Sequence, residues 1–360
     1  MLSNASSKWG GVHRVTELLA EGFEKRGHEV LVLCRPGSLL EDRLRGRCVY
    51  APVARGMDFS PWAIARIAMT LRRFRPTIVL GLMDKDLRLT GPAARLLGMP
   101  FIARRANDQP IGSGPWARMI YGRIVTHHIA NSEATKRTML ASASWLDPER
   151  VSVIPNGVDV EGIASTPPAF LPLPKGSVIV ALVARLEQRK GVLDLLEAWP
   201  SVAQADARAQ LVIVGRGELE NDVHRRSQQL ERVIFLGYRE DVAAVLQRCD
   251  IVAVPSHWEG FGLVAAEAMA AAKPVVATNA SSLPEIVTDE REGLLVPPRQ
   301  PNELADALLR LIRDAELRKR LGEAGRQRAL ESFSHERMIE RYESILTKFA
   351  RRGKAESAAR

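Results

Sequence analysis

The stretch 250–278 constrains the fold more than any other part of the chain. It begins with an apolar run over 251–254, which has the length and composition of a buried strand. A glycine-punctuated turn follows at 259–262, then a run of helix-forming residues over 263–272 and a second apolar run over 274–277. The order strand, glycine turn, helix and strand predicts a β-α-β unit with parallel strands.

The glycine turn has the properties of an anion site. A turn that joins a strand to a helix exposes backbone N–H groups at the positive end of the helix dipole. Two carboxylates flank it, Glu259 in the turn and Glu267 in the helix, and both can accept hydrogen bonds from hydroxyl groups. A nucleotide sugar presents a phosphate beside polyol oxygens, so it fits such a site. The residues alone do not identify the ligand more closely.

The letters of this stretch carry a family resemblance. Glu259 and Glu267 are separated by seven residues. Glu259 begins the letters EGFG, Glu267 begins EAMA, and KPVVAT follows at 273–278. This long ordered pattern closely resembles family 4 of the retaining glycosyltransferases (glycosyl transferases group 1), including those of lipopolysaccharide and cell-surface polysaccharide synthesis. The resemblance implies the α/β fold called GT-B, with two Rossmann-like domains facing across a cleft and a C-terminal helix, about 337–352, that returns to the first domain.

Chain length and element rhythm also favour two domains, because 360 residues exceed one typical core. We expect an N-terminal acceptor-binding domain over 1–158 and a C-terminal donor-binding domain over 176–336. The letters IPNGVD, at 154–159, resemble the hinge signature of the family. The proline-rich segment within 159–175 predicts a linker between the domains.

The opening of the chain departs from the expected pattern. A Rossmann-like domain should begin with a buried strand that leads into a glycine turn and a helix. The first eight residues are polar and short, yet Trp9-Gly10-Gly11 has the character of the turn, and 12–25 has helical spacing of apolar residues. We therefore expect the first strand to be missing or truncated.

Positive charge is concentrated in the N-terminal half. Residues 1–158 hold 23 Lys and Arg against 13 Asp and Glu, whereas the remainder holds 28 against 29. Such a half can attract nucleic acid, anionic lipid or a phosphorylated substrate. The basic helix expected over 61–74, which includes Trp62, either touches anionic lipid or packs with a solvated basic face; the sequence favours packing.

Two further features bear on cellular location. No stretch approaches the roughly 18–20 apolar residues of a membrane span, and no apolar secretion segment follows a basic start. Cys34, Cys48 and Cys249 lack metal-site or redox spacing and are expected to be core thiols. We expect a cytoplasmic protein that can lie peripherally on the inner face of the cytoplasmic membrane.

A second basic motif follows a predicted strand and opens a helix. Arg185 and Lys190, within RLEQRKG, resemble the R-x-x-x-x-K-G element of the family. Cations at a helix start oppose the helix dipole, so a bound anion explains them better than a solvated surface does. By resemblance, Arg185 and Lys190 would neutralise the donor diphosphate, and Glu259 would lie beside the donor sugar.

Other donor contacts are implied by resemblance. Glu267 would bind ribose hydroxyls, and a neighbouring G-x-G, which lacks the third glycine of a dinucleotide fingerprint, would line the donor site. The base would be held near 236–239. The remaining donor-binding residues expected are Gly215, Gly217, Tyr238, Arg239, Phe261, Gly262, Leu263 and Val264. Ser281-Ser282 stand where the family usually has two glycines.

The acceptor side is expected in the N-terminal half, at Gly10, Gly11, His13, Arg104 and Arg105. Many relatives have a histidine where the two arginines stand. Arginine cannot act as a general base at neutral pH, but it can bind an acidic acceptor or the leaving phosphate.

Two further patterns are interpreted as structural. His127 and His128 precede a predicted strand, where such a pair is more often structural than catalytic. Asp84-Lys85-Asp86 spells the D-x-D metal signature of another glycosyltransferase fold, and we interpret it as a surface turn. We therefore expect no catalytic metal and no cofactor.

The sequence thus favours transfer of a sugar from a nucleoside diphosphate sugar to a hydroxyl group of a lipopolysaccharide core or another glycan or lipid-linked acceptor. Without an evident nucleophile, the leaving diphosphate would take the acceptor proton in a front-face reaction. Two alternatives stay open. A GT-B nucleotide-sugar epimerase would need acid and base groups on both sides of the cleft, and a basic nucleic-acid-binding module would explain only the charge, without a stacking platform.

Overall fold

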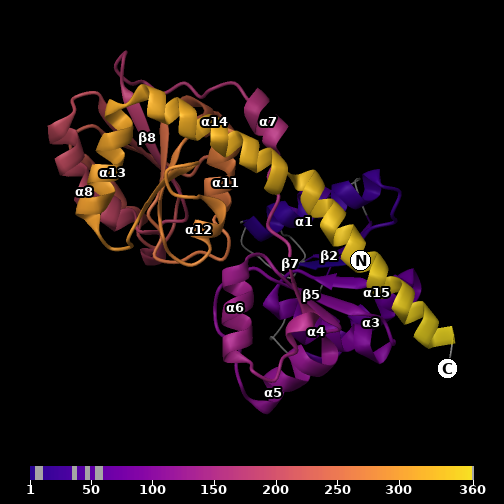
Figure 1. Ribbon diagram of the computed structural model, residues 1–360. Coiled ribbons are helices and arrows are strands. Elements are labelled where there is room, and N and C mark those ends of the chain that lie inside the picture. The colour runs from indigo at the N-terminus through magenta and orange to yellow at the C-terminus, as the bar shows by residue number, and fades with distance from the viewer. Residues whose placement is uncertain (5–10, 35–38, 45–48, 53–59, 359–360) are drawn as a thin grey trace. The chain divides into compact units, whose positions relative to one another are not determined.

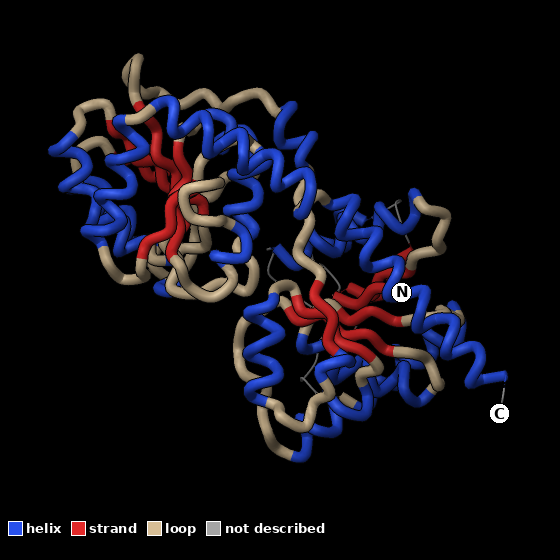
Figure 2. Tube along the Cα trace, viewed as in Figure 1, coloured by secondary structure: helices blue, strands red, loops and turns tan. Residues whose placement is uncertain are grey.

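The computed structural model describes residues 1–358 apart from 5–10, 35–38, 45–48 and 53–59. The chain forms two compact units, and each has its own sheet. Unit 1 comprises Met1–Gly157 and His335–Arg360, and unit 2 comprises Val158–Ser334. In both units a central sheet is covered by helices on its two faces (Figure 1, Figure 2).

The sheet of unit 1 is parallel throughout, with the strand order β3-β2-β1-β4-β5-β6-β7. Its strands are β1 (Leu2–Asn4), β2 (Leu31–Cys34), β3 (Val49–Pro52), β4 (Val79–Gly81), β5 (Phe101–Arg105), β6 (His127–Ala130) and β7 (Val151–Val153). The helices of this unit are α1 (Gly11–Lys25), α2 (Leu39–Leu44), α3 (Pro61–Phe74), α4 (Asp84–Leu96), α5 (Pro115–Ala117), the π-helix η1 (Arg118–Ile124), α6 (Glu133–Ser142), the 3₁₀ turn η2 (Pro148–Arg150) and α15 (His335–Ala358).

Of the two expectations for the first strand, that it is missing or that it is truncated, the first is wrong: a strand is present, and it is short. β1 spans three residues and lies at the centre of the sheet, where Leu2 is aligned with Val32 of β2 and with Leu80 of β4. Leu2 is 2% exposed. The residues of β1 did not identify it as a strand, because one apolar residue among polar neighbours gives no strand pattern and the two flanking strands supply its contacts.

The sheet of unit 2 is also parallel, with the order β10-β9-β8-β11-β12-β13. Its strands are β8 (Val178–Val183), β9 (Ala209–Val214), β10 (Val233–Gly237), β11 (Ile251–Val254), β12 (Val275–Thr278) and β13 (Gly293–Val296). Its helices are α7 (Val160–Ser165), the 3₁₀ turn η3 (Gln188–Lys190), α8 (Val192–Ala205), α9 (Glu220–Gln229), α10 (Val242–Arg248), α11 (Leu263–Ala270), α12 (Leu283–Ile286), α13 (Pro301–Arg313) and α14 (Ala315–Ser332).

Apolar strands and striped helices build the core of unit 2. β8 and β11 are buried along their whole length, as expected for parallel strands that are covered on both faces. α13 buries an apolar stripe and packs beside α8 on one face of the sheet (Figure 1). The stripe comprises Leu304, Leu308, Leu311 and Ile312.

The segment expected as a linker, 159–175, is instead part of unit 2. Residues 160–165 form α7, which is capped by the Asp159 carboxylate. Val160, Ile163 and Leu171 are buried in the same apolar cluster as the strands of this unit. The prolines of the segment indicated an irregular path, but they carried no information on whether its apolar residues find a partner.

The chain returns to unit 1 at α15. This helix packs against α1, and Ile339 fills the space beside Gly22, where a Cβ atom would lie 2.2 Å from Ile339 Cδ1. The Arg26 guanidinium pairs with Glu343 at 2.8 Å on the same side. Cys34 and Cys249 are buried, whereas Cys48 lies outside the described residues. Among the described residues, no helix combines the length and the apolar character needed to cross a membrane.

Candidate functional site

The candidate site lies where the strand order of unit 2 reverses direction. β8 is at the centre of the sheet, its sequence neighbour β9 lies on one side, and β11 pairs with it on the other side. Ligands of such sheets bind at the carboxyl ends of the strands on either side of this point. The two loops concerned are 184–191, which carries Arg185 and Lys190, and 255–262, which carries Glu259.

A glycine lets the two loops touch. Gly191 has φ +65°, and a Cβ atom at this position would lie 1.9 Å from the backbone oxygen of Pro255. A second contact joins the same two loops, because the His257 N–H donates to the Arg189 carbonyl at 2.8 Å. Only glycine accommodates both the left-handed backbone and this close approach.

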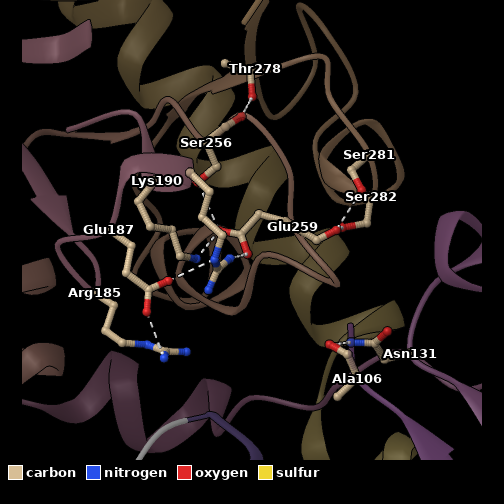
Figure 3. A network of polar contacts seen from close by, with 11 residues as sticks. Ala106, Asn131, Arg185, Glu187, Lys190, Ser256, Glu259, Thr278, Ser281 and Ser282 are labelled. Atoms are coloured by element: carbon tan, nitrogen blue, oxygen red, sulfur yellow. Dashed lines mark hydrogen bonds and ion pairs between the residues drawn. The ribbon is translucent and has the colours of Figure 1, made fainter. Parts of the chain in front are cut away.

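The charged side chains of the two loops form one connected network (Figure 3). Lys190 Nζ donates to Glu259 Oε1, and Arg189 Nη1 lies 3.8 Å from Glu259 Oε2. Glu187 accepts from Arg189 Nε at 2.9 Å through one oxygen, and its other oxygen lies 2.9 Å from Arg185 Nη1. Three cations therefore alternate with two carboxylates, which leaves a net positive charge at the carboxyl ends of β8 and β11.

Lys190 is the most enclosed cation of the network, with 16% of its side chain exposed. Burial lowers the pKa of its ammonium below the ordinary value, and the Glu259 carboxylate opposes this effect. Arg185 differs, because 59% of its side chain is exposed. Lys190 is thus a fixed point charge, whereas Arg185 has room to move.

Glu259 is held from several sides. Ser256 Oγ donates to its carboxylate at 3.0 Å. Ser281 and Ser282 donate to its backbone oxygen at 2.8 and 3.0 Å (Figure 3). The two serines that stand in place of the family's glycines therefore fix the position of the 255–262 loop.

The helix that follows begins with free donors. Gly262, at φ +93°, precedes α11, and no side chain caps this end, so the N–H groups of Leu263 and Val264 have no acceptor within the helix. Phe261 is 4% exposed and packs edge-on against Phe333 in the core, so only its backbone can face a ligand. Glu267 lies one turn into α11 and is half-buried.

The glycines after β9 are structural. A Cβ atom on Gly215 would lie 1.8 Å from the Ala184 oxygen, and one on Gly217 would lie 2.4 Å from the Leu186 oxygen. Both glycines thus let the loop after β9 pack against the Arg185 loop, where the Leu186 N–H donates to the Arg216 carbonyl at 3.0 Å.

Beyond β10, Tyr238 presents an open ring. Its side chain is 44% exposed, and the Arg216 guanidinium lies 4.4 Å from the ring centroid. Arg239 pairs with Asp241, with Nε 2.7 Å from Oδ1, so its charge is already neutralised. Of Tyr238 and Arg239, the tyrosine ring with Arg216 beside it is therefore the better flat surface for a ligand. The sequence did not indicate Arg216, because a lone arginine between glycines has no recognisable pattern.

The N-terminal acceptor residues are only partly described. Gly10 lies outside the described residues, and Gly11 is the first residue of α1. His13, also in α1, is 2% exposed. A contact between these residues and an acceptor stays a prediction.

Arg104 and Arg105 end β5 and are buried, at 2% and 6% exposure. Arg105 Nη1 pairs with the Asp84 carboxylate at 2.9 Å and lies 3.1 Å from the Tyr121 hydroxyl. Arg104 Nη2 donates to Asn156 Oδ1 at 2.6 Å, while its Nε and Nη1 have no hydrogen-bond partner among the residues that the structure describes. Arg105 therefore orders its own loop, and Arg104 retains donor capacity.

The interpretation of Asp84-Lys85-Asp86 as a surface turn is wrong. These residues form the first turn of α4, and the buried Asp86 carboxylate accepts from the N–H groups of Leu82 and Met83 at 3.0 and 2.9 Å. Carboxylates at a helix N-terminus satisfy its free donors and suit its dipole. Within the described part of the chain, no three His, Cys, Asp or Glu side chains gather where they could hold a metal ion.

The histidine pair lies in β6 and is buried. His127 Nε2 is 2.8 Å from Ser152 Oγ, and His128 Nε2 donates to the Tyr121 carbonyl at 2.9 Å. Burial lowers the pKa of His127 to about 4 and that of His128 to about 3. Both rings are neutral near pH 7 and fill structural positions.

Sequence reasoning missed Glu187, Arg189 and the His257–Asp194 pair. His257 Nε2 lies 2.8 Å from the carboxylate of Asp194, which is in the first turn of α8. The Arg189 guanidinium lies 4.6 Å from the centroid of the Trp258 ring. The first contact joins the 255–262 loop to α8, and the second joins it to the 184–191 loop. Neither has a local sequence signal, because its partners are far apart in the chain.

Comparison with known proteins decides the family. The family "Glycosyl transferases group 1" matches residues 167–328, and "Glycosyltransferase Family 4" matches residues 9–161. A phosphatidyl-myo-inositol mannosyltransferase of Mycobacterium leprae is 33% identical over 349 residues, which cover 88% of this chain and 87% of the relative. The chain is a family 4 glycosyltransferase. The sequence-based prediction of the family and of an enzyme is confirmed.

Other relatives of this glycosyltransferase agree. A UDP-Gal:alpha-D-GlcNAc-diphosphoundecaprenol alpha-1,3-galactosyltransferase of Escherichia coli is 26% identical over 330 residues, covering 84% of this chain and 85% of the relative. The structure of Anabaena HepE in complex with UDP and glucose has a TM-score of 0.82 at 21% identity, covering 96% of this chain and 98% of HepE. WaaG, a glycosyltransferase of lipopolysaccharide biosynthesis, has a TM-score of 0.70 at 16% identity, covering 96% and 100%. These structures confirm the GT-B fold.

Proposed function

We propose that this glycosyltransferase moves a sugar from a nucleoside diphosphate sugar to a hydroxyl group, with retention of configuration and without a metal ion. The observation that carries the proposal is the positive network of Arg185, Arg189 and Lys190 on a loop adjacent to the uncapped start of α11. A diphosphate has the charge and the acceptor oxygens that this arrangement lacks. Fixed cations can neutralise that charge in place of a metal ion.

In the proposed reaction, Arg185 and Lys190 stabilise the leaving diphosphate, and the N–H groups of Leu263 and Val264 bind its oxygens. The acceptor oxygen bonds to the anomeric carbon on the face from which the diphosphate departs. Its proton passes to the departing phosphate oxygen, so charge and atoms balance. Glu259 contacts the donor sugar, and Glu267 accepts hydrogen bonds from the ribose.

The proposed donor carries a base that stacks on the exposed ring of Tyr238. HepE was solved with UDP and with UDP-glucose, so uridine diphosphate sugars are the first donors to test. The resemblance does not choose among bases, and guanosine and adenosine donors belong in the same panel.

The test is a screen of nucleoside diphosphate sugars for slow release of free sugar by the purified protein. We expect one donor to be hydrolysed, at a rate that EDTA does not change. The Glu267→Ala variant should lose most of this activity because the ribose loses its acceptor. Loss of activity on chelation would contradict metal independence, and a folded protein that hydrolyses no donor of the panel would contradict the proposed reaction.

We further propose that the acceptor is a lipopolysaccharide core or another glycan or lipid-linked molecule, met at the inner face of the cytoplasmic membrane. The names of the two relatives above place a phosphatidylinositol and a diphosphoundecaprenol among the molecules that those proteins act on. In this chain, the support is a surface of unit 1 that suits anionic lipid headgroups.

That surface runs over α3, α4 and the helices 115–124, which neighbour one another on the sheet. Residues 61–124 hold 11 Lys and Arg and three acids. Asp84 is paired with Arg105, Asp86 is buried, and Asp108 accepts a hydrogen bond from Thr138. Seven arginines of this stretch are exposed: Arg66, Arg72, Arg73, Arg75, Arg95, Arg118 and Arg123.

Large apolar side chains stand among these arginines. Trp62 and Met69 are 69% and 60% exposed on the outer side of α3, where Arg66 and Arg73 continue the same stripe. Trp116 is 65% exposed in the first turn of α5. The sequence favoured packing for 61–74, and the inner side of α3 is buried. The arginines and apolar residues on its outer side support the proposal that it also contacts lipid.

Trp62 also lies at the edge where such sheets bind ligands. A helix that connects parallel strands runs antiparallel to them, so the first turn of α3 lies at the carboxyl edge of the unit 1 sheet. Sheets of this type bind ligands at that edge. A bilayer that contacts Trp62 would present a lipid-linked acceptor at the edge where Arg104 ends β5.

Vesicle flotation tests this surface. We expect binding to vesicles that contain phosphatidylglycerol, little binding to pure phosphatidylcholine, and release by salt. Arg66→Glu/Arg73→Glu should weaken binding more than tenfold, and Trp62→Ala several-fold. Phe170→Ala, at an 88% exposed side chain of unit 2, is the matched control and should bind normally. Equal binding of all variants, or binding that salt does not change, would contradict the proposal.

A further inference from the structure

Glu187 has an unexpected position within the cation network. It lies between two positions of the family element and shares its carboxylate between two cations, Arg185 and Arg189, at 2.9 Å each. A tight turn fixes it there, because the Glu187 N–H donates to the Arg185 carbonyl at 2.8 Å, and its own carbonyl accepts from the Lys190 N–H at 2.9 Å. A carboxylate at this position reduces the net positive charge that is available to a bound anion.

We propose that Glu187 is a built-in competitor of the donor diphosphate, which keeps the nucleoside diphosphate product from binding too tightly. The inference rests on the proposed function, because it concerns the same anion site. In the unliganded protein the Glu187 carboxylate neutralises Arg185. When a diphosphate arrives, Arg185 exchanges this carboxylate for phosphate oxygens, and when the product leaves, Arg185 returns.

The mobility of the three cations supports this exchange. The Arg185 side chain is 59% exposed and can swing between two partners. Arg189 is fixed, because its guanidinium lies over the Trp258 ring, 4.6 Å from the centroid, while its Nε holds Glu187. Lys190 is enclosed and bound to Glu259. Arg185 is thus the one cation of the three that can change partner without disturbing the loop.

The expected consequence follows from charge. A carboxylate within a few ångströms of a bound diphosphate repels it, and removal of this charge strengthens binding of the product. A more tightly bound product leaves more slowly, so turnover falls when release limits the rate. A residue that only held Arg185 in place would have the opposite effect, since its removal would weaken diphosphate binding.

The experiment compares Glu187→Gln with the wild type, using the nucleoside diphosphate of the hydrolysed donor. The glutamine oxygen can still accept from Arg189, so the loop is preserved. We expect the dissociation constant of the diphosphate to fall about five- to tenfold, with kcat and KM for the donor both lower. Glu187→Asp keeps the charge and should stay close to wild type.

Glu197→Gln is the matched control. It removes the same charge from an exposed position of α8, and it should change neither constant. Unchanged or weaker diphosphate binding in Glu187→Gln would overturn the inference while leaving the proposed function intact. A wild-type protein that binds no nucleoside diphosphate would overturn the proposed function, and the inference with it.

Discussion

Single residues at this site differ mainly in how far water reaches them. Lys190 is enclosed and pairs with Glu259, so its charge stays fixed in a place of low polarity, where electrostatic interactions are strong. Arg185 is open and pairs with Glu187 through an interaction that water screens. The same motif therefore supplies a permanent charge and an exchangeable one.

At the residue scale, His128 makes the stability of unit 1 depend on pH. Its pKa is about 3 in the folded protein because it is buried, against about 6.5 in the unfolded chain. Both states are neutral above pH 6.5, and below it only the unfolded chain takes up the proton. Stability is therefore lost as the pH falls from 6.5 towards 3, and we expect about 2 kcal/mol to be lost between pH 7 and pH 5.

Denaturant unfolding at pH 7 and pH 5, followed by hydrogen exchange in β6, measures this loss. In His128→Gln the side-chain amide can still donate to the Tyr121 carbonyl but does not titrate. The difference between the two pH values should be about 2 kcal/mol smaller in this variant. An unchanged difference would show that His128 does not cause the acid sensitivity.

The sequence predicted the motif residues of unit 2 but not their partners. Arg185, Lys190 and Glu259 were predicted from motifs that resemble those of the family, and the structure brings Lys190 and Glu259 into contact. Glu187 and Arg189 occupy variable positions of the same element, and their role depends on which side chains fold against them. Tertiary partners of this kind leave no trace in local spacing.

Among the elements, loops joined by glycines position the site. Gly191 and Gly237 share a backbone φ of +65°, yet their surroundings differ. A Cβ atom would meet nothing within 4 Å at Gly237, whereas at Gly191 it would lie 1.9 Å from the Pro255 oxygen. The pair therefore separates the cost of backbone strain from the cost of a lost loop contact.

At the element scale, we expect Gly237→Ala to cost about 1–2 kcal/mol of unit 2 stability through the left-handed backbone alone. Gly191→Ala should cost clearly more, because the loops after β8 and β11 must separate. It should also weaken nucleoside diphosphate binding more than tenfold, because the loop contact positions Lys190 and Glu259. Calorimetry and thermal unfolding measure both effects, and equal effects of the two variants would contradict the role assigned to the loop contact.

Elements with strong periodicity were predicted well. The helix over 61–74 has the predicted bounds, because it combines an apolar stripe with proline in its first turn. The turn assigned to 84–86 is instead a helix start, because acidic residues suit both settings. The linker predicted over 159–175 was wrong, because apolar residues of this segment pack into the core of unit 2 and the proline content did not indicate this packing.

On the scale of the whole molecule, each unit has one parallel sheet whose strand order reverses at its centre. The alternation of strands and helices predicted this class of fold, whereas the place of each strand in the sheet was not predicted and comes from the structure. β1 shows the limit of the approach, because a three-residue strand is specified by the strands on either side rather than by its own residues. The residues 5–10 that follow it lie outside the described part of the chain.

The most direct test of the central claim is a calorimetric titration with UDP, GDP and ADP and with the matching monophosphates. The claim is that the loops after β8 and β11 bind a diphosphate. It predicts that one diphosphate binds, that its monophosphate binds more weakly, and that Arg185→Ala/Lys190→Ala weakens diphosphate binding at least about thirtyfold. Arg72→Ala/Arg73→Ala, in unit 1, is the control for net charge, and circular dichroism confirms folding. Diphosphate binding that is equal in the wild type and the Arg185/Lys190 double variant would contradict the account.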